Sequence, residues 1–179
     1  HIVGSYDLDR VLAAGDLIRA HPAYVPALVL VLLGAFTKSA QFPFHFWLPN
    51  AMTAPTPVSA FLHSATMVKA GVFLLIRLSP ALSGTEAWFY IVSSAGLATL
   101  LLGAFFALFQ HDLKGVLAYS TISHLGLITA LCGMDTPLAF VAAIFHIVNH
   151  AVFKASLFMA AGIVDHETGT RDMRRLGGL

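Results

Sequence analysis

Long apolar stretches separated by short polar segments dominate the pattern of this sequence. Asp, Glu, Lys and Arg are absent from five stretches, which are residues 20–37, 39–68, 87–111, 115–134 and 136–153. A helix that spans a membrane needs about 20 mainly apolar residues. The pattern therefore predicts an all-α membrane protein with about five crossings, at 24–50, 57–79, 86–109, 113–132 and 137–164.

The two ends of the chain are more polar than its centre. Residues 5–20 have the pattern of an amphipathic helix outside the membrane, with Ser5 placed to serve as its N-cap. We therefore assign 1–22 to an extramembrane segment, 23–164 to the membrane region and 165–179 to a polar loop. The chain starts without an initiator Met or a recognisable signal peptide, so we interpret it as a piece of a longer protein.

Composition supports the membrane assignment. Hydrophobic residues make up 58% of the chain and charged residues 11%, whereas a soluble domain has about 25% charged residues. The net charge of +1 gives no indication of nucleic acid binding, and membrane lipid is the expected surrounding. The single cysteine, Cys132, excludes a disulfide framework and a thiolate metal site within this sequence.

The first predicted crossing is rich in proline. The stretch QFPFHFWLPNAMTAPTP, residues 41–57, contains Pro43, Pro49, Pro55 and Pro57. Each proline removes a backbone donor and opposes helix continuation. The stretch is therefore either a discontinuous membrane helix, of the kind that holds ion sites in transporters, or a proline-rich interfacial loop.

Basic side chains lie near the middle of four of the five predicted crossings. These side chains are Lys38, His63, Lys69, His124, His146, His150 and Lys154. A single histidine at such a depth is often a packing residue, and a lysine near the end of a span can reach the interface. A central lysine, however, costs about 3 kcal/mol on insertion scales, so the set as a whole favours a proton route.

The stretch FHIVNHAVFKASLF, residues 145–158, concentrates this signal. His146, His150 and Lys154 recur every four residues, which places them along one face of a helix. Lysine in a partly hydrated interior and histidine can both exchange protons near neutral pH. Ser120, Thr121 and Ser123 are candidates for interhelical hydrogen bonds or for members of the same wire.

All nine acidic residues lie in predicted loops or at the ends of predicted spans. We therefore expect a Glu or Asp from a helix outside this sequence to pair with Lys38 or Lys69. The pair His146/His150 has a metal-compatible spacing, but no third ligand is placed to help, so we expect no metal site. Without a glycine-rich phosphate loop or paired cysteines, we also expect no cofactor.

The distribution of Lys and Arg favours a cytoplasmic C-terminal loop. With five crossings, one side carries Lys114, Arg171, Arg174 and Arg175, and the other carries Arg10, Arg19 and Arg77. Cytoplasmic loops of membrane proteins carry the excess of positive charge. The majority of four against three places the C-terminal loop in the cytoplasm.

Three stretches of the sequence resemble the proton-conducting antiporter-like subunits. They are KSAQFPFHFWLPNAMTAPTPVSAFLHSATMVKAGVFLL (38–75), HDLKGVLAYSTISHLGLI (111–128) and FHIVNHAVFKASLF (145–158). That superfamily includes the large membrane subunits of respiratory complex I and the A-subunit of Mrp-type multisubunit sodium/proton antiporters. The tail GIVDHETGTRDMRRLGGL is most similar to the Mrp branch.

The resemblance implies a fourteen-helix core of two inverted five-helix repeats, of which this sequence would hold helices seven to eleven. Lys38 matches the lysine of a broken helix supported by Pro43 and Pro49, and His63 matches a histidine of the next helix. The pair Asp112 and Lys114 matches the opening of helix ten. The face with His146, His150 and Lys154 matches a relay between two half-channels, and the carboxylate partner of the first lysine would lie upstream.

The leading hypothesis is a transporter component, not an enzyme, in the cell (inner) membrane. It would conduct protons in a multisubunit Na⁺ or K⁺/proton antiporter, together with other membrane subunits. One alternative is the proton-pumping subunit of respiratory complex I or of a related hydrogenase, with redox cofactors in partner subunits. The other is a non-conducting scaffold subunit, which the buried lysines and histidines disfavour.

Overall fold

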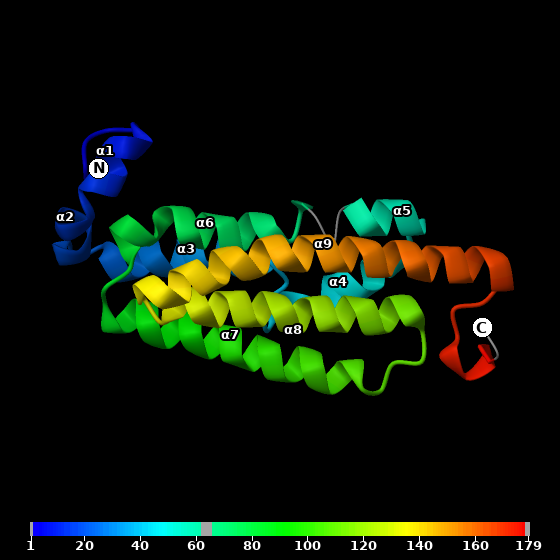
Figure 1. Ribbon diagram of the computed structural model, residues 1–179. Coiled ribbons are helices and arrows are strands. Elements are labelled where there is room, and N and C mark those ends of the chain that lie inside the picture. Colours follow the sequence, from blue (N-terminus) through cyan, green and yellow to red (C-terminus); the bar gives the residue numbers. More distant parts are fainter. Residues whose placement is uncertain (1, 62–65, 178–179) are drawn as a thin grey trace.

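The computed structural model describes residues 2–61 and 66–177, and it shows long helices lying side by side (Figure 1). The helices α7 (Glu86–Ala107), α8 (Leu113–Gly133) and α9 (Pro137–Thr168) are long and apolar enough to cross a membrane. Next to them lie the shorter helices α3 (Tyr24–Lys38) and α6 (Lys69–Leu82). The described residues form no strand beyond an isolated bridge, so the all-α membrane fold is confirmed.

Side-chain caps explain where the three long helices begin. Thr85, Asp112 and Thr136 precede them, and each accepts a hydrogen bond from a backbone amide in the first turn. Such caps satisfy amides that have no partner within the helix. At its other end, α9 stops at Gly169, whose φ of 67° is readily adopted by glycine.

The interruption expected from the prolines is present in the first predicted crossing. After α3 ends at Lys38, Ala40 adopts a φ of 49° and the peptide bond before Pro43 is cis. Three short helical pieces follow, namely η1 (Phe44–Phe46), α4 (Trp47–Asn50) and η2 (Ala51–Thr53).

Neighbouring groups satisfy the backbone at this interruption. The Phe42 amide donates to Thr99 Oγ1 of α7 at 2.9 Å, and the Trp47 indole donates to the Thr37 carbonyl at 3.0 Å. Irregular backbone survives at membrane depth only where protein or a watery cavity covers it.

The second predicted crossing differs from expectation, because residues 57–79 do not form one regular α-helix. The described part contains the short helix α5 (Thr56–Ser59), a π-helical conformation at residues 60, 61 and 66, and the helix α6, which starts only at Lys69 after a turn at Met67 and Val68. The hydroxyl of Thr66 donates to the carbonyl of Phe61 at 3.1 Å, five residues back. Side-chain hydroxyls that bond the local backbone compete with the α-helical pattern.

The two polar ends also differ in detail from the expectation. The segment 5–20 forms two short helices, α1 (Leu8–Ala13) and α2 (Gly15–Ala20), separated at Ala14. At the other end, α9 continues to Thr168, beyond the boundary expected at 164. The segment after it folds back, and Leu113 N donates to Arg171 O at 3.0 Å while Met173 N donates to His111 O at 2.9 Å.

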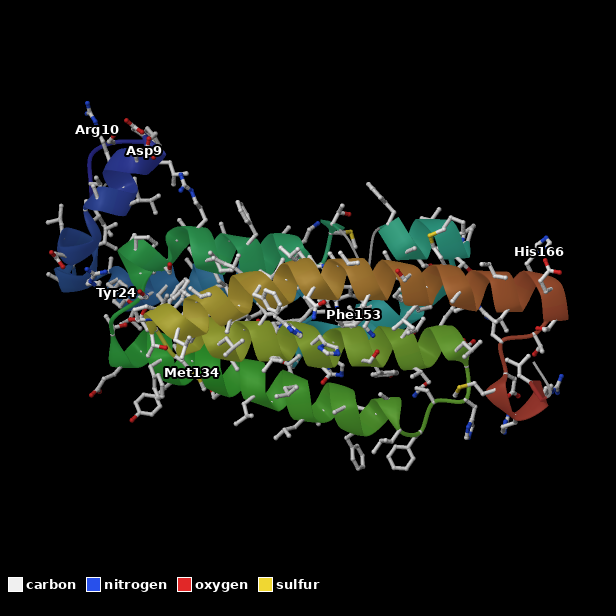
Figure 2. The ribbon with its side chains drawn as sticks, viewed as in Figure 1. Asp9, Arg10, Tyr24, Met134, Phe153 and His166 are labelled. Atoms are coloured by element: carbon white, nitrogen blue, oxygen red, sulfur yellow. The ribbon has the colours of Figure 1, made fainter. Side chains whose placement is uncertain are left out.

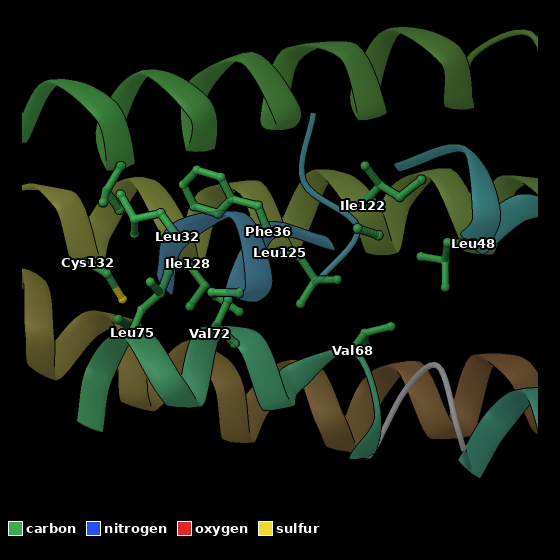
Figure 3. Close-up of a cluster of buried hydrophobic side chains, with 14 of the residues drawn as sticks. Leu32, Phe36, Leu48, Val68, Val72, Leu75, Ile122, Leu125, Ile128 and Cys132 are labelled. Atoms are coloured by element: carbon green, nitrogen blue, oxygen red, sulfur yellow. The ribbon is translucent and has the colours of Figure 1, made fainter. Parts of the chain in front are cut away.

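The buried core lies between α3, α6 and α8 (Figure 3). It contains Leu32 and Phe36 from α3, Val72 and Leu75 from α6, and Ile122, Leu125 and Ile128 from α8. The outer faces of α7 and α9 instead expose large apolar side chains, such as Leu101 and Phe145. Apolar residues on the outside as well as the inside are expected for helices surrounded by lipid or by other membrane helices.

Candidate functional site: a buried cluster of histidine and lysine

The basic face of α9 points toward α8, as its contacts show. His150 is 0% exposed and Lys154 is 2% exposed, although both are ionisable. His146 lies one turn before His150 and is half-buried. Phe153, labelled in Figure 2, marks the position of this cluster between the two helices. The four-residue spacing therefore does define a buried face.

Three imidazole rings contact one another across this interface. His124 of α8 shares a hydrogen bond of 2.9 Å between its Nδ1 and Nε2 of His146. The ring centroids of His124 and His150 are 5.3 Å apart, and those of His146 and His150 are 6.2 Å apart. In the shared bond one nitrogen donates and the other accepts, so a proton can be transferred from one ring to the other.

Lys154 extends the cluster by one turn along α9. Its ammonium donates to the carbonyl of Leu117 at 3.3 Å and to the hydroxyl of Ser120, both on α8. Ser120, expected as an interhelical hydrogen-bond donor or a wire member, therefore lies directly against this lysine.

Lys69 approaches the same cluster from α6. It is the first residue of that helix and only 7% exposed. It lies within electrostatic range of His150, as do Lys154, His124 and His146. Within the described residues, Lys69 Nζ and both ring nitrogens of His150 have no hydrogen-bond partner. Buried polar groups are rarely left unpaired, so these atoms are available for exchange with a further group.

Phe153 is a member of the site that sequence reasoning missed. Its ring lies edge-on to both His124 and His150, with centroids 5.4 and 5.3 Å away, and Lys154 Nζ is 6.0 Å from its centroid. An apolar residue in an apolar helix gives no signal of its own, and only its position next to Lys154 could have indicated it.

Other predicted residues lie outside the cluster. Lys38 is exposed at the end of α3, and His63 lies outside the described residues. Lys114 is 1% exposed in the first turn of α8, where its ammonium donates to the carbonyl of Ala54 at 2.7 Å. The supporting prolines Pro43 and Pro49 lie in the interruption after α3.

Asp112 belongs to a separate polar site at the end of the bundle. Its carboxylate caps α8 through the amide of Lys114 at 2.7 Å and lies 3.4 Å from Arg171 Nη2. A polar cavity of about 710 Å³ lies here, lined by His111, Asp112, Asp165, Gly169, Thr170, Arg171, Asp172 and Arg174. The salt bridges of the described residues involve arginine or histidine, and none involves a lysine. Among all the described residues, no group of three or more His, Cys, Asp or Glu side chains is placed to hold a metal ion.

Helices that cross a membrane, an interrupted helix and a buried basic cluster define the chain as part of a multi-helix membrane protein. Over residues 1–179 it matches the family described as NADH:quinone oxidoreductase/Mrp antiporter, TM. The chain belongs to this family.

Two curated relatives and one solved structure are similar to the chain. The chain is 78% identical, over 99% of its length, to the A/B-subunit of a probable K(+)/H(+) antiporter of Rhizobium meliloti, of which it covers 18%. It is 54% identical, over 99% of its length, to the A-subunit of the Na(+)/H(+) antiporter of Alkalihalophilus pseudofirmus, of which it covers 24%. The solved Mrp complex from Dietzia sp. DQ12-45-1b matches with a TM-score of 0.84 and 54% identity, over 91% of this chain and 18% of that one. The chain thus spans about a fifth of the length of these relatives.

Proposed function

We propose that this chain is the central part of a proton-conducting membrane subunit in a multisubunit monovalent cation/proton antiporter. The observation that carries the proposal is the cluster in which Lys69, His124, His146 and Lys154, from three helices, lie within electrostatic range of the buried His150. No carboxylate among the described residues pairs with these lysines. Buried ionisable groups inside a membrane are costly, and a proton pathway is their usual role.

The proton would pass along α9 between α6 and α8. Lys69 of α6 and Lys154 of α9 both lie within electrostatic range of His150, and His124 with His146 forms a hydrogen-bonded pair beside it. A neutral imidazole can accept a proton on one nitrogen and release the other nitrogen's proton. Transfer through the cluster would use the bond between His124 and His146, and water or ring rotation would complete the steps to His150 and the two lysines.

The remaining predicted residues extend this pathway toward both sides of the membrane. Lys38, exposed at the end of α3, would contact a carboxylate from the part of the protein outside this sequence. His63, which lies outside the described residues, would take part as the histidine that the family resemblance implies. Lys114 and Asp112 would connect the cluster with the polar cavity at the start of α8, which would face the cytoplasm if the positive-inside rule holds for this loop.

The exchanged cation is K⁺ or Na⁺, in line with the names of the two relatives, and other membrane subunits would complete the complex. The alternative of a respiratory pump would make proton movement depend on an electron donor. Transport in vesicles without such a donor separates the two functions.

The test uses the full-length protein within its complete complex, in everted membrane vesicles. Proton movement is followed by a pH-sensitive dye after addition of Na⁺ or K⁺. His150→Gln and Lys154→Gln remove groups that exchange protons, and each should lower the rate about tenfold or more. His166→Gln is the matched control, because that histidine lies on the same helix with its side chain 85% exposed.

Wild-type rates in both His150→Gln and Lys154→Gln, with normal assembly, would contradict the proposed pathway. An equal loss in His166→Gln would show that the helix, not the cluster, is sensitive to substitution.

A further inference from the structure

The hydroxyl of Ser39 joins the interruption of α3 to the start of α6. Ser39 is the C-cap of α3 and only 1% exposed. Its Oγ donates to the carbonyl of Val68 at 2.7 Å and accepts from the amide of Val72 at 3.0 Å. This carbonyl and this amide belong to residues four positions apart at the start of α6.

The two helices approach very closely at this point. A Cβ atom added to Gly71 would lie 3.1 Å from the backbone carbonyl carbon of Ala35 and would collide with Ser39 Oγ. Glycine at this position therefore lets the hydroxyl reach the α6 backbone. Val68 lies at the start of α6 beside the buried core (Figure 3).

The position of Ser39 in the chain links this contact to the two lysines Lys38 and Lys69. Ser39 directly follows Lys38, and Val68 directly precedes Lys69, so one side chain connects the two lysine-bearing ends of α3 and α6. Lys69 Nζ has no hydrogen-bond partner within the described residues. Its place relative to His150 therefore depends on the backbone that carries it, and Ser39 holds that backbone.

We propose that Ser39 is a positioning residue for Lys69, whose hydroxyl fixes the first turn of α6 against the interruption of α3. The inference rests on the proposed proton pathway through Lys69. Ser39 touches neither the proton nor any of the imidazole rings; it acts through the backbone of residues 68–72. When the chain after Lys38 moves, the backbone that carries Lys69 therefore moves with it.

A serine within α6 provides a matched control. Ser79 is also buried, at 6% exposed, but its hydroxyl donates at 2.8 Å to the carbonyl of Ile76 within its own helix. Ser79→Ala removes a buried hydroxyl of the same helix without touching the link to α3.

The experiment compares Ser39→Ala, Ser39→Thr, Ser79→Ala and Lys69→Gln in the full-length protein within the complete complex. Hydrogen exchange of residues 66–75 measures how often the first turn of α6 opens, and vesicle transport gives kcat and the KM for the cation. In Ser39→Ala, exchange should rise and kcat should fall, each about fivefold or more, because the substitution removes two hydrogen bonds and the loss of one alone is worth about fivefold. The KM should stay unchanged, because the substitution does not touch cation binding.

Ser39→Thr keeps the hydroxyl and should restore most of the rate, and Ser79→Ala should behave as wild type. Where Ser39→Ala does not assemble, Ser39→Cys replaces it, since the thiol has a similar shape and donates only weakly. The positioning role would be overturned by wild-type exchange or wild-type kcat in Ser39→Ala, or in Ser39→Cys where that variant replaces it. An equal effect in Ser79→Ala would overturn it as well.

The Lys69→Gln variant separates this inference from the proposed function. If Lys69→Gln abolishes transport while Ser39→Ala leaves exchange and rate unchanged, the pathway stands and the role of Ser39 is overturned. If Lys69→Gln transports at the wild-type rate, Lys69 is not in the pathway, and both the step through Lys69 and the role of Ser39 are overturned.

Discussion

His124 on α8 and His146 on α9 share a hydrogen bond of 2.9 Å across the interface of the two helices, with their rings stacked at 27°. The two rings come from positions 22 residues apart in sequence, yet they form a hydrogen-bonded pair. Both rings also lie beside His150, with which they complete the group of three imidazoles.

This pairing predicts that the two histidines act together in transport. His124→Gln and His146→Gln should each lower the turnover of the complex about tenfold. The double variant should fall little further, because either single substitution already removes the shared bond, and residues that act as a unit are not additive. Vesicle transport of the two single variants and the double variant measures this coupling; multiplication of the two single effects would contradict it.

The contact between Ser120 and Lys154 predicts a smaller effect from loss of the hydroxyl. Ser120→Ala leaves the Lys154 ammonium only the Leu117 carbonyl, at 3.3 Å, as hydrogen-bond acceptor, so transport should fall about fivefold, as expected for the loss of a hydrogen bond worth about 1 kcal/mol. Ser156→Ala is the control, since that serine lies on α9 and bonds only the Val152 carbonyl of its own helix. Equal rates in the two variants would show that Ser120 does not hold Lys154.

The close packing of α7 on α8 predicts a difference between two glycines. A Cβ at Gly103 would lie 2.6 Å from the Ser123 amide nitrogen of α8, whereas a Cβ at Gly34 of α3 would meet nothing within 4 Å. Gly103→Ala should therefore lower the free energy of unfolding by about 1–3 kcal/mol. Gly34→Ala should be neutral, or stabilising by up to about 1 kcal/mol, because alanine favours the helix.

Thermal unfolding of the purified complex, with both variants expressed in the same way, measures this difference. A Gly103→Ala variant as stable as Gly34→Ala would show that the two helices are less closely packed than in this structure.

The polar segment after α9 predicts a pH dependence at the acidic end of the scale. Hydrogen bonds from Arg174 to the Asp172 carboxylate, at 2.9 and 2.7 Å, lower the pKa of that carboxyl from 3.8 to about 2. A lowered pKa in the folded state means that this contact stabilises the segment above about pH 4, and that the stabilisation disappears as the pH falls toward 2.

An NMR titration of the complex with ¹³C-labelled aspartate checks this value, with Asp172→Asn identifying the signal. Arg174→Gln should return the pKa of Asp172 toward its ordinary value. An unchanged titration in Arg174→Gln would assign the lowered pKa to another cause.

The sequence was sufficient for the long helices and for the basic face of α9. Uninterrupted apolar stretches bounded by Thr85, Asp112 and Thr136 define α7, α8 and α9, and the four-residue spacing of His146, His150 and Lys154 requires a common face. The interruption after α3 was predictable as well, because proline cannot continue a helix.

Other features depend on tertiary contacts that the pattern does not carry. Lys38 and Lys69 are both central in apolar stretches, but the first is exposed and the second is buried, since only packing decides which face of an apolar helix turns inward. The late start of α6 could not be predicted either, because the partner of its first turn is a hydroxyl 29 residues earlier. The pairing of His124 with His146 likewise requires the register of two helices, which a lone histidine in α8 does not reveal.

The fold-back of the segment after α9 has a mechanical consequence for the histidine pair. At one end, α8 and α9 are joined covalently by the short turn 134–136. At the other end, the amide of Leu113 donates to the carbonyl of Arg171, and the guanidinium of Arg171 lies near the carboxylates of both Asp112 and Asp165. The two helices are therefore connected at both ends, and neither can slide along the other without breaking one of these connections. The bond between His124 and His146 lies between these two connections, so a sliding motion that would break it must first release one of them.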